Sequence, residues 1–154
     1  MQKKVLWLDN DPAYLEDYVK ALERAGYNVT VVTNVTAAES ALQNEPYDLL
    51  LLDVMIPTKS EGEEKLYPPE TTDSGLKTGL MFYERMKSVL VARGTAVLVM
   101  TVRLDSGIVE GFEQLGLDRR HFSTKMALRE TQTFMEKIER LVNNPETTEA
   151  RRGE

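Results

Sequence analysis

Five short apolar runs recur along this chain, and amphipathic stretches with helical spacing separate them. The runs cover residues 5–8, 29–32, 49–52 and 97–100, with a weaker run near Phe122. Continuous apolar runs of this length predict strands that are buried on both faces. Because strands alternate with helices, the connections should be right-handed crossovers between parallel strands. We therefore expect an α/β fold, with a doubly wound parallel sheet of five strands covered by helices on both faces.

Turn and cap residues predict where the intervening helices begin and end. Asp11 can cap the first helix and Pro12 can occupy its first position. Asp105 or Ser106 should cap the fourth helix. Glycines end three of the helices, at Gly26, Gly94 and Gly116, and the apolar stripes of the five helices fall within residues 15–22, 36–44, 80–90, 108–115 and 128–142.

Composition excludes several classes of function. The chain has 154 residues, a net charge of −6, no cysteine and a single histidine. An acidic chain argues against non-specific nucleic-acid binding and against docking to an anionic membrane. The missing cysteines and the single histidine exclude thiolate and multi-histidine metal sites. No apolar run is long enough to span a bilayer or to serve as a signal peptide, so we expect a cytoplasmic protein.

Two segments lie outside the alternating pattern. Residues 58–78 form a long connection in which Pro68, Pro69 and the acidic residues at 61, 63 and 64 disfavour a packed element. A loop of this length in a compact domain is usually functional or disordered. Residues 143–154 are polar and should form a flexible tail. We therefore predict one domain over residues 1–142, with an inserted loop at 58–78.

Chemically active side chains follow the predicted strands. Asp9, Asn10 and Asp11 follow the first strand and Asp53 follows the third. Thr101 ends the fourth strand and Lys125 follows the fifth. Since the carboxyl ends of parallel strands meet at one edge of a sheet, these groups should converge there. Crowded carboxylates attract a hard cation such as Mg²⁺, while Thr101 and Lys125 could bind phosphoryl oxygens and Asp53 could act as the nucleophile.

The sequence resembles the response-regulator receiver domain of two-component signalling. The pieces that carry the resemblance are VLWLDNDP (5–12), DLLLLDVMIP (48–57), TGLMFYERMK (78–87), AVLVMT (96–101) and HFSTK (121–125). They occur in the order that the family shows and extend from residue 3 to about residue 142. The resemblance implies the flavodoxin-like (βα)5 receiver fold with strand order 2-1-3-4-5.

The resemblance also implies roles for individual residues. Asp53 matches the phospho-acceptor, and Asp9 matches the first member of the acidic pair that binds Mg²⁺ or Mn²⁺. The backbone carbonyl of Met55 matches a further metal ligand. Thr101 and Lys125 match the groups that contact the phosphoryl oxygens. Phe122 matches the aromatic switch residue, although aromatic strand residues usually serve only as core.

Several positions depart from the family pattern. Asn10 stands where a second acid is usual, which should lower the affinity for Mg²⁺, although Asp11 is close enough to contribute. Val102 replaces a small residue and Met126 replaces a proline, and the loop after Pro57 is longer than usual. Elsewhere, His121 and the acidic residues of the loop are expected at the surface. Trp7 should be core on the same face of the strand as Asp9.

The leading hypothesis is a stand-alone signalling receiver rather than an enzyme. It would take a phosphoryl group from a histidine kinase or phosphotransfer protein and act through contact with a downstream protein. The residues after the last predicted helix are too few for a DNA-binding domain, no membrane contact is expected, and a weak homodimer is compatible with the family.

Two alternatives remain. A degenerate receiver could bind a partner without phosphorylation, through its surface or through residues 58–78. A phosphohydrolase of the haloacid-dehalogenase type would use Asp9 as the nucleophile and Asp11 as the acid/base. This second alternative lacks the further acidic motif that such enzymes carry after the lysine.

Overall fold

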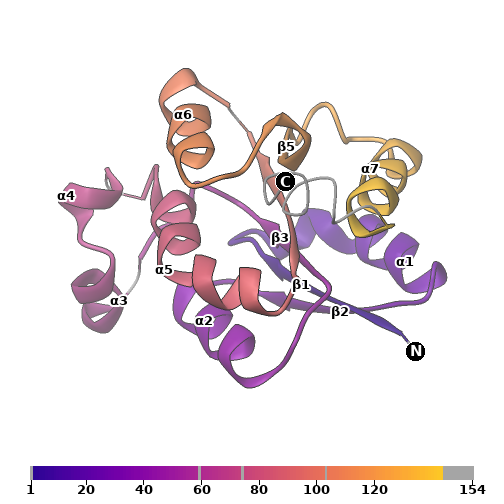
Figure 1. Ribbon diagram of the computed structural model, residues 1–154, viewed down its shortest axis with the longest axis horizontal. Coiled ribbons are helices and arrows are strands. Elements are labelled where there is room, and N and C mark those ends of the chain that lie inside the picture. Colours follow the sequence, from indigo (N-terminus) through magenta and orange to yellow (C-terminus); the bar gives the residue numbers. More distant parts are fainter. Residues whose placement is uncertain (1, 59, 74, 103, 144–154) are drawn as a thin grey trace.

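A parallel five-stranded sheet forms the centre of the molecule (Figure 1). The computed structural model describes residues 2–58, 60–73, 75–102 and 104–143. The strands are β1 (Lys3–Leu8), β2 (Tyr27–Val32), β3 (Leu49–Leu52), β4 (Ala96–Thr101) and β5 (Phe122–Thr124). Their order is β2-β1-β3-β4-β5. The predicted fold class and strand order are therefore confirmed.

Helices cover both faces of this sheet. One layer contains α1 (Glu16–Arg24) and α7 (Thr131–Asn143), which pack against each other. The other contains α2 (Val35–Asn44), α5 (Thr78–Ala92) and α6 (Ser106–Gln114). Two 3-10 turns, η1 (Pro12–Leu15) and η2 (Arg119–His121), precede α1 and β5. Figure 1 shows the two layers on opposite sides of the sheet.

The alternation of side chains along β1 gives each helical layer its own core. Val5 and Trp7 pack toward α1 and α7, whereas Leu6 and Leu8 pack toward α2 and α5. Both sets are fully buried, as expected for a strand covered on both faces. Trp7 is core as predicted, and its ring stacks on Phe134 of α7 with the ring centroids 5.5 Å apart.

The predicted cap at Asp105 is confirmed, whereas that at Asp11 is wrong. Asp105 accepts a hydrogen bond of 2.9 Å from the backbone N–H of Ile108. Asp11 precedes η1, but within the described ranges its side chain makes no capping hydrogen bond. Its own N–H donates instead to Asp9 Oδ1, at 2.8 Å. The chain therefore enters α1 through a 3-10 turn that begins at Pro12, and the carboxylate tied to the backbone at this turn is that of Asp9.

The segment predicted as an inserted loop contains two short helices, α3 (Glu61–Leu66) and α4 (Pro69–Thr72). Ser60 caps α3 by accepting a hydrogen bond of 3.1 Å from the N–H of Glu63. Pro69 occupies the first turn of α4, where the missing N–H of proline costs nothing. The acidic residues and the proline that predict an unpacked loop therefore lie in the first turns of these two helices.

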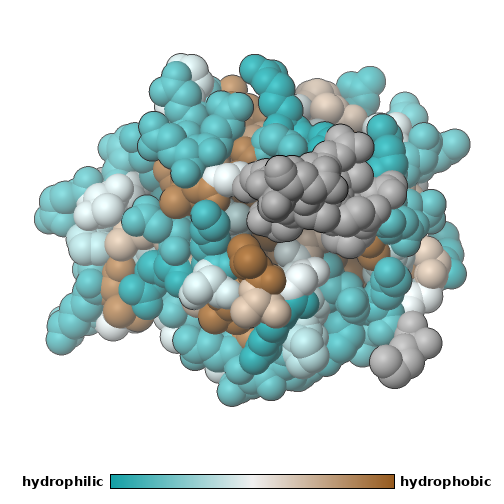
Figure 2. Space-filling view, viewed as in Figure 1, coloured by the Kyte–Doolittle hydropathy of each residue, from teal (hydrophilic) through white to brown (hydrophobic). Residues whose placement is uncertain are grey.

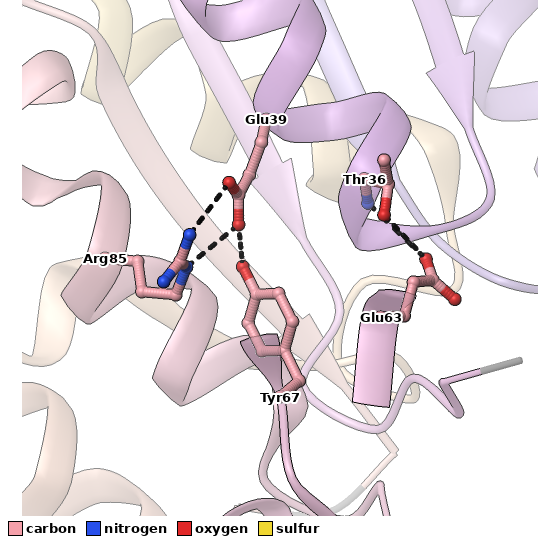
Figure 3. A network of polar contacts seen from close by, with 5 residues as sticks. All are labelled: Thr36, Glu39, Glu63, Tyr67 and Arg85. Carbon is pink, nitrogen blue, oxygen red and sulfur yellow. Dashed lines mark hydrogen bonds and ion pairs between the residues drawn. The ribbon is translucent and has the colours of Figure 1, made fainter. Parts of the chain in front are cut away.

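Side chains from this insert bind it to α2 and α5 (Figure 3). The ring of Tyr67 is fully buried, and its hydroxyl donates a hydrogen bond to Glu39 of α2. Arg85 of α5 forms two hydrogen bonds to the same carboxylate, of 3.0 and 3.2 Å. The Arg85 guanidinium also lies 5.4 Å from the centre of the Tyr67 ring. Tyr67 therefore joins three elements through one carboxylate.

A second contact anchors the start of the insert. Glu63, predicted to be solvated, is only 5% exposed, and its carboxylate accepts a hydrogen bond of 3.2 Å from the hydroxyl of Thr36 (Figure 3). Thr36 lies in the first turn of α2, where the helix dipole stabilises a negative charge. The expectation that all three acidic residues of the segment are solvated is therefore wrong for Glu63.

His121 is also buried, contrary to the prediction that it lies at the surface. It is 5% exposed, and its Nδ1 lies 2.8 Å from the carbonyl oxygen of Val97. Since a carbonyl oxygen only accepts, Nδ1 carries the proton. Burial lowers the pKa of the His121 imidazole, although the Val97 carbonyl and Asp118 oppose this effect.

Hydrophilic residues dominate the face shown in Figure 2, and the hydrophobic residues that reach it form small groups among them. Within the described ranges, the chain has no helix with the length and apolar character needed to cross a membrane. The predicted cytoplasmic location stays a prediction. The predicted tail begins at Asn143, which is the last residue of α7, and its remaining residues lie outside the described part of the chain.

The anchoring of the insert can be tested at Tyr67. Tyr67→Phe keeps the buried ring and should cost about 1.5–3 kcal/mol of unfolding free energy, the usual value of a hydrogen bond to a charged group. Tyr67→Ala removes the ring as well and should cost about 3–5 kcal/mol. Urea unfolding would measure both. A cost below about 0.5 kcal/mol for Tyr67→Ala, typical of surface substitutions, would contradict the packing described here.

His121 should make stability depend on pH. Because its pKa is lowered by folding, the unfolded chain binds a proton more readily than the folded chain below about pH 6.5. The wild type should therefore lose stability relative to His121→Asn as the pH falls from 7.5 to 5.5. The side-chain amide of that variant can donate a hydrogen bond in place of Nδ1, and all other titrating groups are shared by the two chains. Parallel unfolding curves at both pH values would contradict the burial of His121.

Candidate functional site

The strand register brings the ends of β1 and β3 side by side. Leu8 is the partner of Leu52 in the sheet, so Asp9 and Asp53 are adjacent residues at its carboxyl edge. The N–H of Asp53 donates a hydrogen bond of 3.0 Å to the carbonyl of Leu8, which extends this pairing to Asp53. On the other side, Thr101 of β4 pairs with Thr124 of β5, directly before Lys125.

Lys125 links the two aspartates. Its Nζ lies 3.0 Å from Asp9 Oδ2 and 3.2 Å from Asp53 Oδ2. Both carboxylates are almost fully buried, whereas the lysine side chain keeps 19% of its surface exposed. One ammonium group therefore balances two buried carboxylates at the edge of the sheet. The structure thus brings together three of the residues that the sequence singled out.

Asp53 is held against the backbone that follows it. The N–H of Met55 donates to Asp53 Oδ1 at 3.3 Å. Burial raises the pKa of Asp53 to about 6; Lys125 opposes this rise and Asp9 adds to it. Burial therefore outweighs the two donors, Lys125 and Met55, that favour the ionised form of Asp53.

A glycine of α5 lies against the backbone of Asp53 and Val54. A Cβ atom at Gly79 would come within 2.3 Å of the Asp53 carbonyl oxygen and 2.6 Å of Val54 Cα. The N–H of Gly79 donates to the Val54 carbonyl at 2.8 Å. Glycine is therefore required for α5 to begin against the loop that carries Asp53.

Thr101 presents an unused hydroxyl at the end of β4. The residue is fully buried, and within the part of the chain that the structure describes its Oγ1 has no hydrogen-bond partner. Val99, two residues earlier, pairs with Leu52 in the sheet. Thr101 therefore lies at the level of Val54, beside the backbone that follows Asp53. A buried hydroxyl without a partner is costly, and an oxygen-rich ligand at this edge would remove that cost.

Phe122 is buried in the core between α6 and the sheet. Its ring lies 5.6 Å from that of Phe112, in an edge-to-face arrangement. This position agrees with the core role considered for it, and its role as a switch stays a prediction.

The other departures from the family pattern lie around the site. Asn10 is half-buried, and Asp11 is exposed. Val102 and Met126 are exposed to 64% and 67%. The structure holds no cis peptide bond among its described residues.

The residues present fit a hard divalent cation. Asp9 and Asp53 both direct carboxylate oxygens at the Lys125 ammonium. The backbone N–H of Met55 donates a hydrogen bond to Asp53. Oxygen donors of this kind are those that Mg²⁺ prefers. Across the described residues, however, no three acidic, histidine or cysteine side chains gather into a metal cluster. With Asn10 in place of an acid, the site supplies two carboxylates, and its metal affinity should be correspondingly modest.

Tyr14 is part of the site, although the sequence analysis did not include it. Its hydroxyl donates a hydrogen bond of 2.7 Å to Asp9 Oδ2, and its ring centre lies 4.7 Å from Lys125 Nζ. Tyr14 belongs to η1, where it follows Asp9 by five residues. It lies just before the apolar stripe of residues 15–22, and no signal in the sequence distinguishes its hydroxyl.

The carboxyl edge of this doubly wound α/β domain thus carries two carboxylates, an ammonium and a free hydroxyl among the described residues. Residues 5–66 match the family model described as the response regulator receiver domain. Among curated proteins, the chain is 44% identical over 55 residues to the response regulator receiver protein CpdR of Brucella abortus. It is 43% identical over 54 residues to the sensor histidine kinase GacS of Pseudomonas protegens. These alignments cover 36% and 35% of this chain, but only 46% of CpdR and 6% of GacS.

Solved structures extend the likeness in fold to nearly the whole chain. A CheY-like receiver domain protein from Methanospirillum hungatei JF-1 matches with a TM-score of 0.72 and 20% identity, over 96% of this chain and 98% of that one. A response regulator from Thermotoga maritima matches with a TM-score of 0.68 and 20% identity, over 94% of this chain and all of that one. The resemblance to the response-regulator receiver domain is therefore confirmed, in sequence over residues 5–66 and in fold beyond them.

Replacing the Asp53 carboxylate by a neutral group should increase the stability of the folded protein. Because burial disfavours the ionised carboxylate, Asp53→Asn should raise the unfolding free energy at pH 7.5 by about 1–3 kcal/mol without divalent cations. Asp73→Asn, at an exposed carboxylate, is the matched control and should stay within about 0.5 kcal/mol. A loss of stability in Asp53→Asn, measured by urea unfolding, would show that the Lys125 pair outweighs the cost of burial.

Proposed function

We propose that this protein is a signalling receiver that accepts a phosphoryl group on Asp53. The donor would be a phosphohistidine of a histidine kinase or phosphotransfer protein, with Mg²⁺ or Mn²⁺ as the cofactor. The observation that carries the proposal is the Lys125 ammonium held between Asp9 and Asp53, next to a Thr101 hydroxyl that has no partner among the described residues. The match of residues 5–66 to receiver domains supports it.

In the proposed reaction, a carboxylate oxygen of Asp53 attacks the phosphorus of the phosphohistidine. A P–O bond forms and the P–N bond breaks, so the electron pair and then a proton pass to the imidazole nitrogen. The product is an acyl phosphate on Asp53. The bound cation would offset the charge of the phosphoryl oxygens, with Asp9, Asp53 and the Met55 carbonyl as its protein ligands and the Asn10 amide beside them.

Two side chains would then bind the transferred group. Lys125 already contacts Asp53 Oδ2 and would pair with a phosphoryl oxygen. Thr101 would donate the hydrogen bond for which the described part of the chain supplies no acceptor. Phe122 pairs in the sheet with Val99, two residues from Thr101, so a shift of Thr101 would reach the α6 and β5 surface. Output would pass to a downstream protein, or to a second copy of the chain, through contact.

Phosphorylation can be tested by intact mass after incubation with a small phosphodonor and Mg²⁺. The wild type should gain one phosphoryl group and Asp53→Asn none. Thr101→Val, which keeps the shape and removes the hydroxyl, should retain acceptance but lower its rate by roughly tenfold or more, the usual effect of one lost transition-state donor. Failure of the wild type to gain the group from any donor would contradict the proposal.

The same variants separate the phosphohydrolase alternative. If Asp9 were the nucleophile, Asp53→Asn would still turn over a phosphomonoester and Asp9→Asn would not. We expect no turnover that depends on Asp9 alone. The burial of Asp9 under three hydrogen-bond donors supports this expectation, because a carboxylate so occupied is a poor nucleophile.

A binding module that acts without phosphorylation is the second candidate. The observation in its favour is the anchored insert, since Tyr67 and Glu63 fix α3 and α4 on the surface of the domain. A partner that bound wild type and Asp53→Asn equally, with phosphodonor present, would favour this candidate over the first.

A further inference from the structure

Tyr14 contacts Asp9 and Lys125, the two charged residues beside Asp53. Its hydroxyl donates to Asp9 Oδ2 at 2.7 Å, and its ring faces the Lys125 ammonium at 4.7 Å. Cation–π contacts of this kind favour an ammonium held over the ring face. One side chain therefore holds the acid that would bind the metal and the lysine that would bind the phosphoryl group.

The hydrogen bonds of Asp9 leave little room for a metal ion. Asp9 Oδ2 accepts from the Tyr14 hydroxyl and from Lys125, at 2.7 and 3.0 Å. Asp9 Oδ1 accepts from the N–H of Asp11 at 2.8 Å. Because a carboxylate oxygen accepts about two bonds in the protein interior, Oδ2 is saturated. A divalent cation that binds Oδ2 must displace either the tyrosine or the lysine.

The tyrosine hydroxyl is a permanent donor at neutral pH. An ordinary phenol holds its proton at neutral pH. The Tyr14 hydroxyl therefore donates to Asp9 Oδ2 and competes with a metal ion for that oxygen.

We propose that Tyr14 is a positioning residue that sets the metal affinity of this site, by occupying the Asp9 oxygen that a divalent cation would take. The inference rests on the proposed function, because it assumes that the cation binds at Asp9 and Asp53. In the metal-free protein the hydroxyl of Tyr14 and the ammonium of Lys125 together satisfy Asp9. A cation that takes Oδ2 from the tyrosine must break the Tyr14 hydrogen bond, and this cost weakens binding.

Aromatic contacts connect Tyr14 to the only tryptophan of the chain. The ring of Tyr14 meets that of Tyr18 at 6.4 Å, and Tyr18 meets Trp7 at 6.0 Å. The ring of Tyr18 also lies 4.9 Å from Phe134 of α7. Departure of the Tyr14 hydroxyl from Asp9 would move a ring in this cluster, so Trp7 fluorescence should report it.

The test compares Mg²⁺ binding to wild type, Tyr14→Phe and Tyr18→Phe by isothermal titration calorimetry, with Trp7 fluorescence as a second readout. Tyr14→Phe keeps the ring and removes only the hydroxyl, so it should bind Mg²⁺ roughly ten- to hundredfold more tightly, as expected for one lost hydrogen bond to a charged group. Tyr18→Phe makes the same chemical change one helical turn away and should stay within about twofold of wild type. Its hydroxyl lies outside the Asp9 contacts.

The outcomes separate this inference from the proposed function. If the wild type binds Mg²⁺ and Tyr14→Phe binds it equally or more weakly, the role of Tyr14 is wrong and the metal site stands. If only Tyr14→Phe binds Mg²⁺, the inference is supported in its strongest form. If neither binds, both the inference and the metal dependence of the proposed function are overturned. Equal tightening in Tyr14→Phe and Tyr18→Phe would assign the effect to the aromatic cluster and overturn the inference.

Discussion

The contact of one lysine with two buried aspartates is the interaction on which the candidate site depends. Asp9 and Asp53 follow paired residues of adjacent strands, so the sheet itself forces two carboxylates together. Two negative charges in this position repel each other and lose hydration. Lys125 directly follows β5, the edge strand that β4 separates from β3. Its long, flexible side chain reaches across β4 to both aspartates. The fold therefore brings the aspartates together, and the lysine offsets the repulsion between their carboxylates.

The need to pair buried charged and polar groups also explains the polar contacts of the insert. Glu39 would be a costly charge beside α5 without Arg85, and the hydroxyl of Tyr67 would be unpaired in the core without Glu39. These groups satisfy one another across three elements, so the insert is held by a network and by the burial of one ring. At the end of β4, by contrast, the hydroxyl of Thr101 finds no partner in the described part of the chain. The contrast separates a region whose polar groups are paired from one that leaves a buried hydroxyl unpaired among the described residues.

The sheet and the convergence of its strand ends could be predicted because both follow from local patterns. Apolar runs fix the strands, their alternation with helices fixes parallel pairing, and Asp9, Asp53, Thr101 and Lys125 then follow from their places after those strands. The errors have a different origin. The burial of Tyr67, Glu63 and His121 depends on partners 28, 27 and 24 residues away, namely Glu39, Thr36 and Val97. Tyr14 was missed because it lies in a 3-10 turn before the apolar stripe, and the sequence gives no sign of where its hydroxyl points.

Charge balance gives the cation a larger part after the proposed transfer than before it. In the unmodified site two carboxylates face one ammonium, which leaves one net negative charge. An acyl phosphate on Asp53 would replace one charge by about two, since phosphoryl groups carry about −1.5 to −2 at neutral pH. Asp9 and the phosphoryl group would then exceed what Lys125 alone can balance. A site with Asn10 in place of an acid, and with Tyr14 on Asp9, can therefore hold its cation weakly at rest and still need it once the phosphoryl group is present. Such a site would couple metal retention to phosphorylation through charge alone.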